Sequence, residues 1–536
     1  MFWADELAAR VSGPQVVNDS KTPSGTVHVG SLRGPVLLDV IVRALRDRGL
    51  ETELRYGVDD LDPMDAQALL TPDAIERSMG VPLAHVPDPA GDGHGSYARH
   101  FAEVFTATFE GLGIQPDVYY WMSDVYGAGL MDRYIRIALD RADAVRDIYR
   151  RVSHVERPAG WVPVHVICPT CGRIGTTLAS DWDGETVAFG CLPDLVEWAT
   201  GCGTTGRLSP FGGNGKLPWN LDWAAKWSVF GVTIEPCGKD LATAGGSRDR
   251  AEAIAREVFE REPPLRVDYE FLNIHGRKMS TSRGHGAAAH EIAEVLPPEQ
   301  LRLLFLRSRP NQAIEFDPDG TDAIPRLFDE SDRLAAAVAG REFRGELPPD
   351  YERLFSMSLV ERPGSAAEVT EVAAAHRPAF AHLAFLLQVP GTDLVASAEA
   401  EKGAPLSEAE RALLDERARA ARAWLAAYAP DRARVEVQDS LPDAVTDLTA
   451  EQRSFLADLG DRLATSASWT GDVLQGAVFD AARDRGLPTG QAFAALYAAF
   501  LARPNGPRAG WLLASLDRAF VATRLREAAA AGTLAT

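Results

Sequence analysis

Positive charge is scarce in this chain, which has 55 lysine and arginine residues against 76 aspartate and glutamate residues and a net charge of −21. This balance predicts weak, salt-sensitive non-specific binding to nucleic acid, because cations that neutralise phosphates supply much of that affinity. A net negative charge is still compatible with a local basic patch on the surface. A general adaptation of the surface to solubility explains the total equally well.

Cysteine is also rare, and long apolar runs are absent. Five cysteines in 536 residues exclude a disulfide framework. No apolar run is long enough to span a bilayer, and the first residues lack the basic start and apolar stretch of a secretory signal. We therefore expect a cytoplasmic protein without a membrane partner. A chain of this length is too long for one hydrophobic core, so several domains are expected.

The first 60 residues predict the opening of a Rossmann-type fold. A short strand ends near Val17, and turn-forming residues fill 18–30. A helix with one apolar face follows; Ser31 can cap its start and Gly49 ends it. A second strand covers 51–56. Strand, loop, helix and strand in this order indicate an α/β domain with a parallel sheet.

A glycine-rich turn joins the first strand to the helix, with the pattern Pro23-Ser-Gly25-x-x-His28-x-Gly30. The two glycines allow the backbone to approach a nucleotide, and the free N–H groups at the start of the helix suit a phosphate. His28 is placed to donate a hydrogen bond to a phosphate oxygen. An isolated histidine is more simply a surface or core imidazole, but its position inside this motif favours the phosphate role.

A second motif occurs about 250 residues later, from Gly276 to Gly284. In this segment Lys278 can neutralise a leaving pyrophosphate, and the hydroxyls of Ser280, Thr281 and Ser282 can donate further hydrogen bonds. Taken alone, the segment can equally be interpreted as a flexible basic loop without a catalytic role.

In this order and at this spacing, the two motifs resemble the HIGH-type and KMSKS-type signatures of class I aminoacyl-tRNA synthetases. The resemblance implies formation of an aminoacyl adenylate with ATP and Mg²⁺: the carboxylate of an amino acid attacks the α-phosphate, and pyrophosphate leaves. That transition state carries extra negative charge, so His28 and Lys278 are the implied catalytic residues. Thr281 stands where many class I enzymes have a second lysine, and Arg283 is the nearest alternative cation.

The rest of the chain is most similar to class I lysyl-tRNA synthetases. The resemblance rests on residues 215–227, 238–240, 245–247 and 269–271, and on 504–508 near the C-terminus. It implies a monomeric lysine–tRNA ligase that activates L-lysine with ATP and transfers lysine to the 3′ end of tRNA(Lys). The implied fold is α/β: a Rossmann-type catalytic domain with a zinc-binding insert and an all-α C-terminal domain.

The same resemblance implies which residues bind the two small substrates. Those implied for ATP are Pro23, Gly25, His28, Gly30, Ser31, Gly238, Lys239, Asp240, Lys278, Met279, Ser280 and Ser282. Those implied for the amino acid are Ser20, Thr22, Asp59, Asp60, Trp223, Leu241 and Tyr269.

Lysine needs a carboxylate for its ammonium and an apolar or aromatic wall for its stem. The candidate carboxylates are Asp59, Asp60 and Asp222, and the candidate wall is Trp219, Trp223 and Tyr269. Core packing explains the tryptophans equally well.

Two positions depart from the family pattern, which has glycine where this chain has Ser20 and histidine where it has Leu241. Both are expected near the amino acid. They leave open an adenylate-forming ligase of the same fold that uses another amino acid or a non-tRNA acceptor. The helical C-terminus of some 190 residues argues against a non-tRNA acceptor. A third alternative, a non-catalytic RNA-binding protein, would tolerate the loss of His28 or Lys278, and both are present.

Four of the five cysteines predict a structural zinc site. Cys168-Pro-Thr-Cys171 supplies two thiolates from one tight turn, and Cys191 and Cys202 supply two more. Four protein ligands leave no open position on the metal, so the site is structural rather than catalytic. His165 is a possible replacement ligand, and four free thiols in a reducing cytosol are the alternative.

We expect four parts in the chain. Residues 1–163 are the first half of the Rossmann domain with connecting helices, and 164–215 are the zinc-binding insert. Residues 216–345 are the second half, with the second motif and a region that contacts the tRNA stem, and 346–536 are a helical anticodon-binding domain. The last part begins where the composition changes to alanine, leucine and arginine, and capping boxes at Ser407 and Thr449 open two of its helices.

Overall fold

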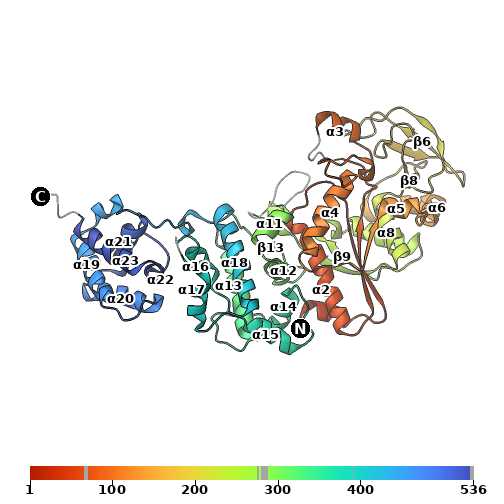
Figure 1. Ribbon diagram of the computed structural model, residues 1–536. Coiled ribbons are helices and arrows are strands. Elements are labelled where there is room, and N and C mark those ends of the chain that lie inside the picture. The colour runs from red at the N-terminus through yellow and green to blue at the C-terminus, as the bar shows by residue number, and fades with distance from the viewer. Residues whose placement is uncertain (66–70, 275–276, 279–287, 390–391, 532–536) are drawn as a thin grey trace. The chain divides into compact units, whose positions relative to one another are not determined.

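The computed structural model describes residues 1–65, 71–274, 277–278, 288–389 and 392–531 (Figure 1). The chain forms two compact units. The first consists of Met1–Asp317 and Arg344–Val369, and the second of Pro318–Phe343 and Thr370–Thr536. Within the described ranges, no helix has both the length and the apolar character needed to cross a membrane.

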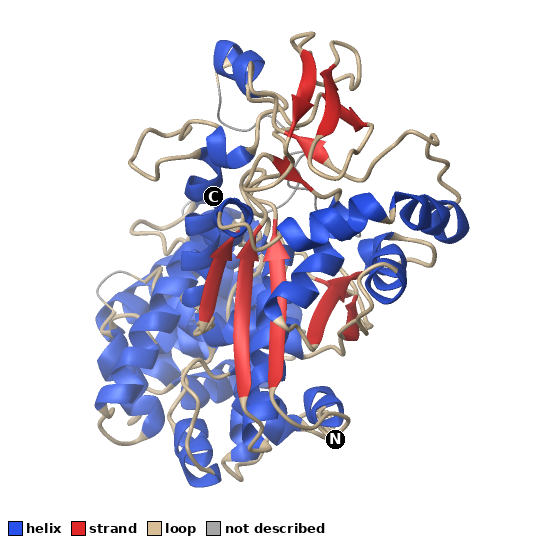
Figure 2. Ribbon diagram, turned by 90° about the vertical axis from the view of Figure 1, so that its right-hand side faces the viewer, coloured by secondary structure: helices blue, strands red, loops and turns tan. Residues whose placement is uncertain are grey.

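A five-stranded parallel sheet organises the first unit (Figure 2). In spatial order its strands are β10 (Leu265–Tyr269), β9 (Ile234–Gly238), β1 (Gln15–Lys21), β2 (Thr52–Val58) and β3 (Val118–Trp121). The chain runs outward from β1 to β3 and then returns to the other side of β1 for β9 and β10. The order therefore reverses between β1 and β9, and such a switch point is where open α/β sheets bind ligands. The predicted Rossmann-type arrangement is confirmed.

Two helices cover opposite faces of the sheet next to β1. Asp19 of β1 lies against Gly34 of α2 (Arg33–Asp47), whereas the neighbouring Ser20 accepts a hydrogen bond from Lys226 of α8 (Trp219–Phe230). Successive residues of a strand point to opposite faces, so the two helices lie on opposite sides. The two faces at the end of β1 therefore differ in chemistry, which matters for the site described below.

The start of α2 differs in one detail from the sequence prediction. The chain enters this helix through a 3₁₀ turn, η1 (Val29–Leu32), in which Ser31 is an internal residue rather than the cap. The residue that precedes this turn is His28. A 3₁₀ turn is a common entry into an α-helix, and here it moves the start of the helical segment ahead of the serine.

The other helices of the first unit surround this sheet. They are α1 (Trp3–Ala8), α3 (Pro72–Ser78), η2 (Leu83–His85), α4 (Tyr97–Glu110), α5 (Met122–Gly127), α6 (Asp132–Asp140), α7 (Ala142–Ser153), α9 (Lys239–Ala242), α10 (Ser247–Glu257), α11 (Ala289–Val295), α12 (Pro298–Leu306) and α14 (Tyr351–Ser358). A small sheet of β11 (Leu272–Ile274), β12 (Arg277–Lys278) and β13 (Ile314–Glu315) follows β10 and carries the start of the second motif.

The predicted insert is a small β-rich subdomain. Its strands β4 (His165–Val166) and β8 (Gly215–Lys216) pair at its two ends, where the chain leaves and rejoins the larger fold. Between them, β5 (Thr177–Ser180), β6 (Val187–Cys191) and β7 (Thr205–Leu208) form an antiparallel sheet. The four cysteines of the predicted zinc site lie in this antiparallel sheet and in the turns around it.

The second unit is helical throughout its described residues. Its helices are α13 (Ala323–Val338), α16 (Phe380–Leu386), α17 (Leu394–Lys402), α18 (Glu408–Ala427), η4 (Asp431–Ala433), η5 (Asp443–Asp447), α19 (Ala450–Ala464), α20 (Gly471–Asp484), α21 (Thr489–Leu501), α22 (Ala509–Ala514) and α23 (Arg518–Ala530). Helix α15 (Ala366–Ala374) spans the division between the units. Both predicted capping boxes, Ser407 with Glu410 and Thr449 with Gln452, are confirmed at the starts of α18 and α19.

The change in composition near residue 345 coincides with the return of the chain to the first unit, which includes residues 344–369. Helix α14 packs there through buried guanidinium groups: Arg302 donates to the Met357 carbonyl at 2.8 and 3.2 Å, and Arg43 donates to the Leu359 carbonyl at 2.7 Å. Residues 318–343, which precede α14, belong to the second unit. The functional division into four parts stays a prediction.

Candidate active site and metal centre

The carboxyl ends of four strands bring most of the predicted site residues to one edge of the sheet. Ser20 and Thr22 lie at the end of β1, and Asp59 and Asp60 follow β2. From the other side of the switch point come residues 238–240 after β9 and Tyr269 at the end of β10. Segments more than 200 residues apart in the sequence thus converge where ligands bind in such sheets.

The first motif forms a tight turn between β1 and η1. Gly25 has a φ of +154°, which favours glycine, and both Pro23 and Gly25 are buried. The Tyr97 hydroxyl of α4 donates to the Ser24 carbonyl at 3.0 Å and fixes the outside of the turn. His28 is half-buried and immediately precedes η1, so its backbone leads directly into the N–H groups at the start of the helical segment.

The segment that follows the second motif is joined through its backbone to the first motif. His28 forms an antiparallel bridge with Ala288, and the Ala289 amide donates to the Val27 carbonyl at 2.9 Å. Lys278, at the end of β12, pairs in register with Asn273 of β11. The other predicted residues of the second motif, Met279, Ser280 and Ser282, lie outside the described residues. The segment that follows the second motif is therefore hydrogen-bonded to the first.

A buried ionic network underlies the site on the α8 face of the sheet. The Lys226 ammonium lies 2.7 Å from Asp59 Oδ1, 2.9 Å from Ser20 Oγ and 3.5 Å from Asp222 Oδ2. Burial alone would lower the pKa of Lys226, but the charges of Asp59 and Asp222 outweigh it and raise that pKa well above its ordinary value. Lys226, Asp59 and Asp222 are all less than 5% exposed. Two of the three predicted ammonium-binding carboxylates thus already bind an internal lysine.

The third predicted carboxylate also has internal partners. Asp60 accepts hydrogen bonds from the Ser123 amide at 2.8 Å and the Ser123 hydroxyl at 2.5 Å. The Thr22 hydroxyl donates to Asp62 at 2.6 Å, and Asp62 is paired with the buried Lys216. The four residues predicted to bind the amino acid at the ends of β1 and β2 therefore all have internal hydrogen-bond or ion-pair partners.

The predicted Trp223 lies in the core, and the predicted Leu241 is a partly buried residue that packs against it. The indole N–H of Trp223 donates to Glu235 Oε2 at 2.8 Å, and Trp223 is only 6% exposed. Trp219 packs against it with ring centroids 5.0 Å apart. Leu241 packs against the same core cluster. Core packing, the alternative weighed for the tryptophans, accounts for these contacts.

A cavity of about 260 Å³ opens at the ends of β9 and β10. The Lys239 ammonium lies 2.6 Å from Glu270 Oε1, which ties the predicted Gly-Lys-Asp turn to the end of β10. Asp240 is exposed next to it. The cavity is lined by Lys239, Ala242, Thr243, Asp268, Tyr269, Glu270 and Asn311. Its charged lining suits a polar ligand.

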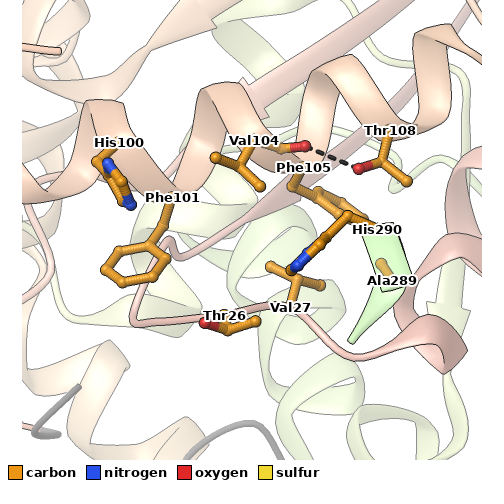
Figure 3. Close-up of a pocket in the computed structure, with 9 residues that line it drawn as sticks. All are labelled: Thr26, Val27, His100, Phe101, Val104, Phe105, Thr108, Ala289 and His290. Carbon is orange, nitrogen blue, oxygen red and sulfur yellow. Dashed lines mark hydrogen bonds between the residues drawn. The ribbon is translucent and has the colours of Figure 1, made fainter. Parts of the chain in front are cut away.

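A separate apolar pocket of about 370 Å³ adjoins the outside of the first motif (Figure 3). Phe101, Val104 and Phe105 of α4 form one wall, and Val27 and His290 lie opposite. The Thr108 hydroxyl donates to the Val104 carbonyl at 2.8 Å, as the dashed line shows. Because this lining is mostly apolar, the pocket does not suit a triphosphate.

The four cysteines of the insert converge as predicted. The sulfurs of Cys168, Cys171, Cys191 and Cys202 all lie within 4.8 Å of one another. The Cys168–Cys202 and Cys171–Cys191 sulfur distances are 3.6 and 3.7 Å. A tetrahedral zinc ion with Zn–S bonds of about 2.3 Å requires sulfurs about 3.8 Å apart. The donor set therefore fits Zn²⁺, and His165 is not a member of this cluster.

We expect protein purified without chelators to hold about one zinc ion per chain at these cysteines. Cys191→Ser should lose that ion, because one of four thiolates is removed, whereas His165→Ala should keep it. Elemental analysis of the purified proteins measures both outcomes. Full zinc content in Cys191→Ser together with loss in His165→Ala would show that the ligand set is wrong.

The sequence analysis missed a second group of possible metal ligands. Ligand atoms of Asp92, His94 and His100, in the loop before α4 and its first turns, also lie within 4.8 Å of one another. Glu103 accepts a hydrogen bond from His94 at 2.5 Å and raises the pKa of that histidine. Because the pKa of His94 is raised, a metal ion would compete with a proton for this histidine. If the purified protein holds more than the one zinc ion expected at the cysteines, loss of the additional zinc in His94→Ala would assign it to this group.

Comparison with known proteins shows similarity to tRNA synthetases. The family model "tRNA synthetases class I (K)" matches residues 1–359. A lysine–tRNA ligase of Archaeoglobus fulgidus is 34% identical and covers 98% of this chain and 100% of its own length. Lysine–tRNA ligase 1 of Methanosarcina acetivorans is 33% identical, with 98% of each chain covered. A solved glutamate–tRNA synthetase of Elizabethkingia anophelis is 12% identical, with a TM-score of 0.42 over 96% of this chain and 99% of that one.

Proposed function

Because this chain belongs to the class I (K) family of tRNA synthetases, we propose that it is a lysine–tRNA ligase. It activates L-lysine with ATP to lysyl-adenylate, releases pyrophosphate, and transfers lysine to the 3′ end of tRNA(Lys). The observation that carries the proposal is the match along 98% of the chain to relatives named lysine–tRNA ligases. The two linked motifs at the switch point of the sheet support it.

In the activation step, a carboxylate oxygen of lysine attacks the α-phosphorus of ATP, and the bond to the β-phosphate oxygen breaks. His28 donates to an oxygen of the α-phosphate, whose negative charge grows in the transition state. The N–H groups of the turn that begins after His28 add to this stabilisation. Lys278 neutralises the departing pyrophosphate, and Mg²⁺ bound with ATP would supply further positive charge there. The four cysteines would hold a zinc ion that stabilises the insert, and with four protein ligands this ion would have no open position for the chemistry.

The remaining parts follow from the same proposal. Among the predicted ATP residues, the backbone of the 23–31 segment receives the phosphates, and Gly238, Lys239 and Asp240 border the nucleotide at the end of β9. The helices of the second unit bind the anticodon region of tRNA(Lys). The protein works as a monomer in the cytoplasm.

The alternative is an adenylate-forming ligase of this fold with another amino acid or a non-tRNA acceptor. It draws on Ser20 and Leu241, which differ from the family pattern. Ser20 is bound within the buried lysine network and Leu241 packs against the core, so internal contacts account for both residues. The similarity to the relatives also continues through the helical unit. Both points favour the tRNA ligase.

We predict that lysine alone among the twenty amino acids supports strong ATP–pyrophosphate exchange. Exchange should be measured with Mg²⁺, with and without total tRNA, because some activation reactions require the bound tRNA. Charging of total tRNA with lysine then distinguishes the ligase from an enzyme with another acceptor. Strong exchange with a different amino acid and none with lysine would refute lysine as the substrate while leaving adenylate formation intact.

A further inference from the structure

One carboxylate at the site edge, Asp19, lies on the α2 face of the sheet, away from the lysine network. Its neighbour Ser20 points to the α8 face, so the two adjacent residues of β1 face opposite layers. A Cβ added at Gly34 of α2 would lie 2.8 Å from Asp19 Oδ2 and 3.2 Å from the Tyr269 hydroxyl. The carboxylate and the phenol oxygen therefore converge on the bare backbone of Gly34.

Asp19 differs from its neighbours in what it binds. Its Oδ1 accepts a hydrogen bond from the Ser20 amide at 2.8 Å. Within the described part of the chain, no side-chain cation lies within 4.0 Å of its carboxylate, whereas Asp59 binds Lys226 and Asp62 binds Lys216. Asp19 is half-buried and lies where β1 reaches the site edge. It is a negative charge at the site edge without a short internal ion pair.

The surroundings of Asp19 suit an alkyl chain that ends in a cation. Tyr56 of β2 stands directly opposite Asp19 in the register of the sheet, and Tyr269 approaches from β10. Side chains of paired residues point to the same face, so aromatic rings flank the carboxylate. Aromatic walls shield the methylene stem of a lysine side chain, while the carboxylate and the phenol oxygen accept hydrogen bonds from its ammonium.

We propose that Asp19 and Tyr269 form the subsite for the side-chain ammonium of the amino-acid substrate, and that Asp19 makes the site selective for a primary alkyl ammonium. This inference rests on the proposed lysine activation and deepens it. It replaces Asp59, Asp60 and Asp222, whose carboxylates bind Lys226, Ser123 and Tyr126 instead.

The electrostatics of Asp19 support this role. Burial, together with the nearby negative charge of Glu235, raises the pKa of Asp19 to about 7. The Ser20 amide, Lys21 and Lys226 act in the opposite direction but do not cancel this rise. Tyr56 and Tyr269, which also face it, are neutral because burial raises the pKa of both phenols. A substrate ammonium supplies the positive charge that the ionised carboxylate lacks.

The test compares two substrates in Asp19→Asn. The substrates are lysine and ε-hydroxynorleucine, in which a hydroxyl replaces the ammonium. We expect kcat/KM for lysine in pyrophosphate exchange to fall about a hundredfold, mainly through KM, because a charge-assisted contact is lost. The preference for lysine over ε-hydroxynorleucine should collapse, while KM for ATP stays unchanged. Asp19→Glu, which keeps the charge, should retain the preference.

The matched control is Asp117→Asn. Asp117 lies just before β3, at the opposite edge of the parallel sheet, where it pairs with Arg46 at 2.8 Å and its side chain is 43% exposed. The same change of residue away from the site edge should therefore leave the substrate preference intact. The pH profile gives a second readout: KM for lysine should fall from pH 6 to pH 8 in the wild-type enzyme as Asp19 ionises, and should be flat in Asp19→Asn.

The outcomes separate this inference from the proposed function. If the wild-type enzyme activates lysine and Asp19→Asn keeps its preference for lysine over ε-hydroxynorleucine, the inference is wrong and the proposed function stands. Equal losses for both substrates, also in Asp19→Glu, would show a structural role and overturn the inference. If the wild-type enzyme does not activate lysine, both are wrong.

Discussion

His28→Ala is expected to slow lysine-dependent pyrophosphate exchange by roughly a hundredfold to a thousandfold. The imidazole is held at the residue before η1, where it adds to the N–H groups of the helix start. A donor placed at the phosphate acts most strongly on the charge that develops in the transition state. KM for ATP should therefore change much less than kcat. Lys278→Ala should show the same pattern, because its positive charge acts on the departing pyrophosphate.

The control for His28→Ala is His290→Ala. His290 is an exposed histidine on α11, near the same turn, and it lines the apolar pocket. Its loss should leave the exchange rate within about twofold of the wild-type value, as expected for a surface substitution. Exchange by His28→Ala at a near-normal rate would show that His28 has been assigned the wrong role.

The sequence predicted those parts of the site whose structure is determined by residues close together in the chain or by one residue type. The turn from Pro23 to Gly30 follows from glycine placement directly after a strand, and its helix follows from an apolar stripe. The cysteine site follows from a C-x-x-C turn and two later thiols. Each of these patterns is confined to a short segment or to a residue type with one dominant chemistry.

The parts that the sequence did not predict depend on distant partners. Lys226 and Asp59 are 167 residues apart, and nothing near either residue shows that they form an ion pair. Carboxylates that look available for a substrate ammonium are therefore bound internally. The role of Asp19 depends on which face of β1 it occupies and on the missing side chain of Gly34. Neither fact is visible before the register of the sheet and the place of α2 are known.

Local sequence patterns also could not predict which unit the residues near 345 belong to. Alanine-rich composition begins there, yet α14 packs against Arg302 and Arg43 of the first unit. Composition reports the kind of element that a segment forms, whereas unit membership depends on which surface buries it.

Lys226→Met is expected to lower the free energy of unfolding by about 3–5 kcal/mol. The substitution keeps most of the volume but leaves Asp59 and Asp222 as buried carboxylates without their shared cation. Both are less than 5% exposed, so water cannot replace the ammonium. Urea unfolding followed by tryptophan fluorescence measures the loss, since Trp223 and Trp227 lie on the same helix as Lys226.

The control for this prediction is Arg256→Met, on α10. Its ion pairs with Glu252 and Glu262 span 3.7 and 3.4 Å, and its side chain is 48% exposed, so its removal should cost at most about 1 kcal/mol. Lys226→Met combined with Asp59→Asn should be less destabilised than the sum of the single changes, because each removes a charge that the other leaves unpaired. If the two losses add, or if Lys226→Met costs no more than Arg256→Met, Lys226 does not hold these carboxylates together. Asp59 would then be available again as an acceptor for the substrate ammonium.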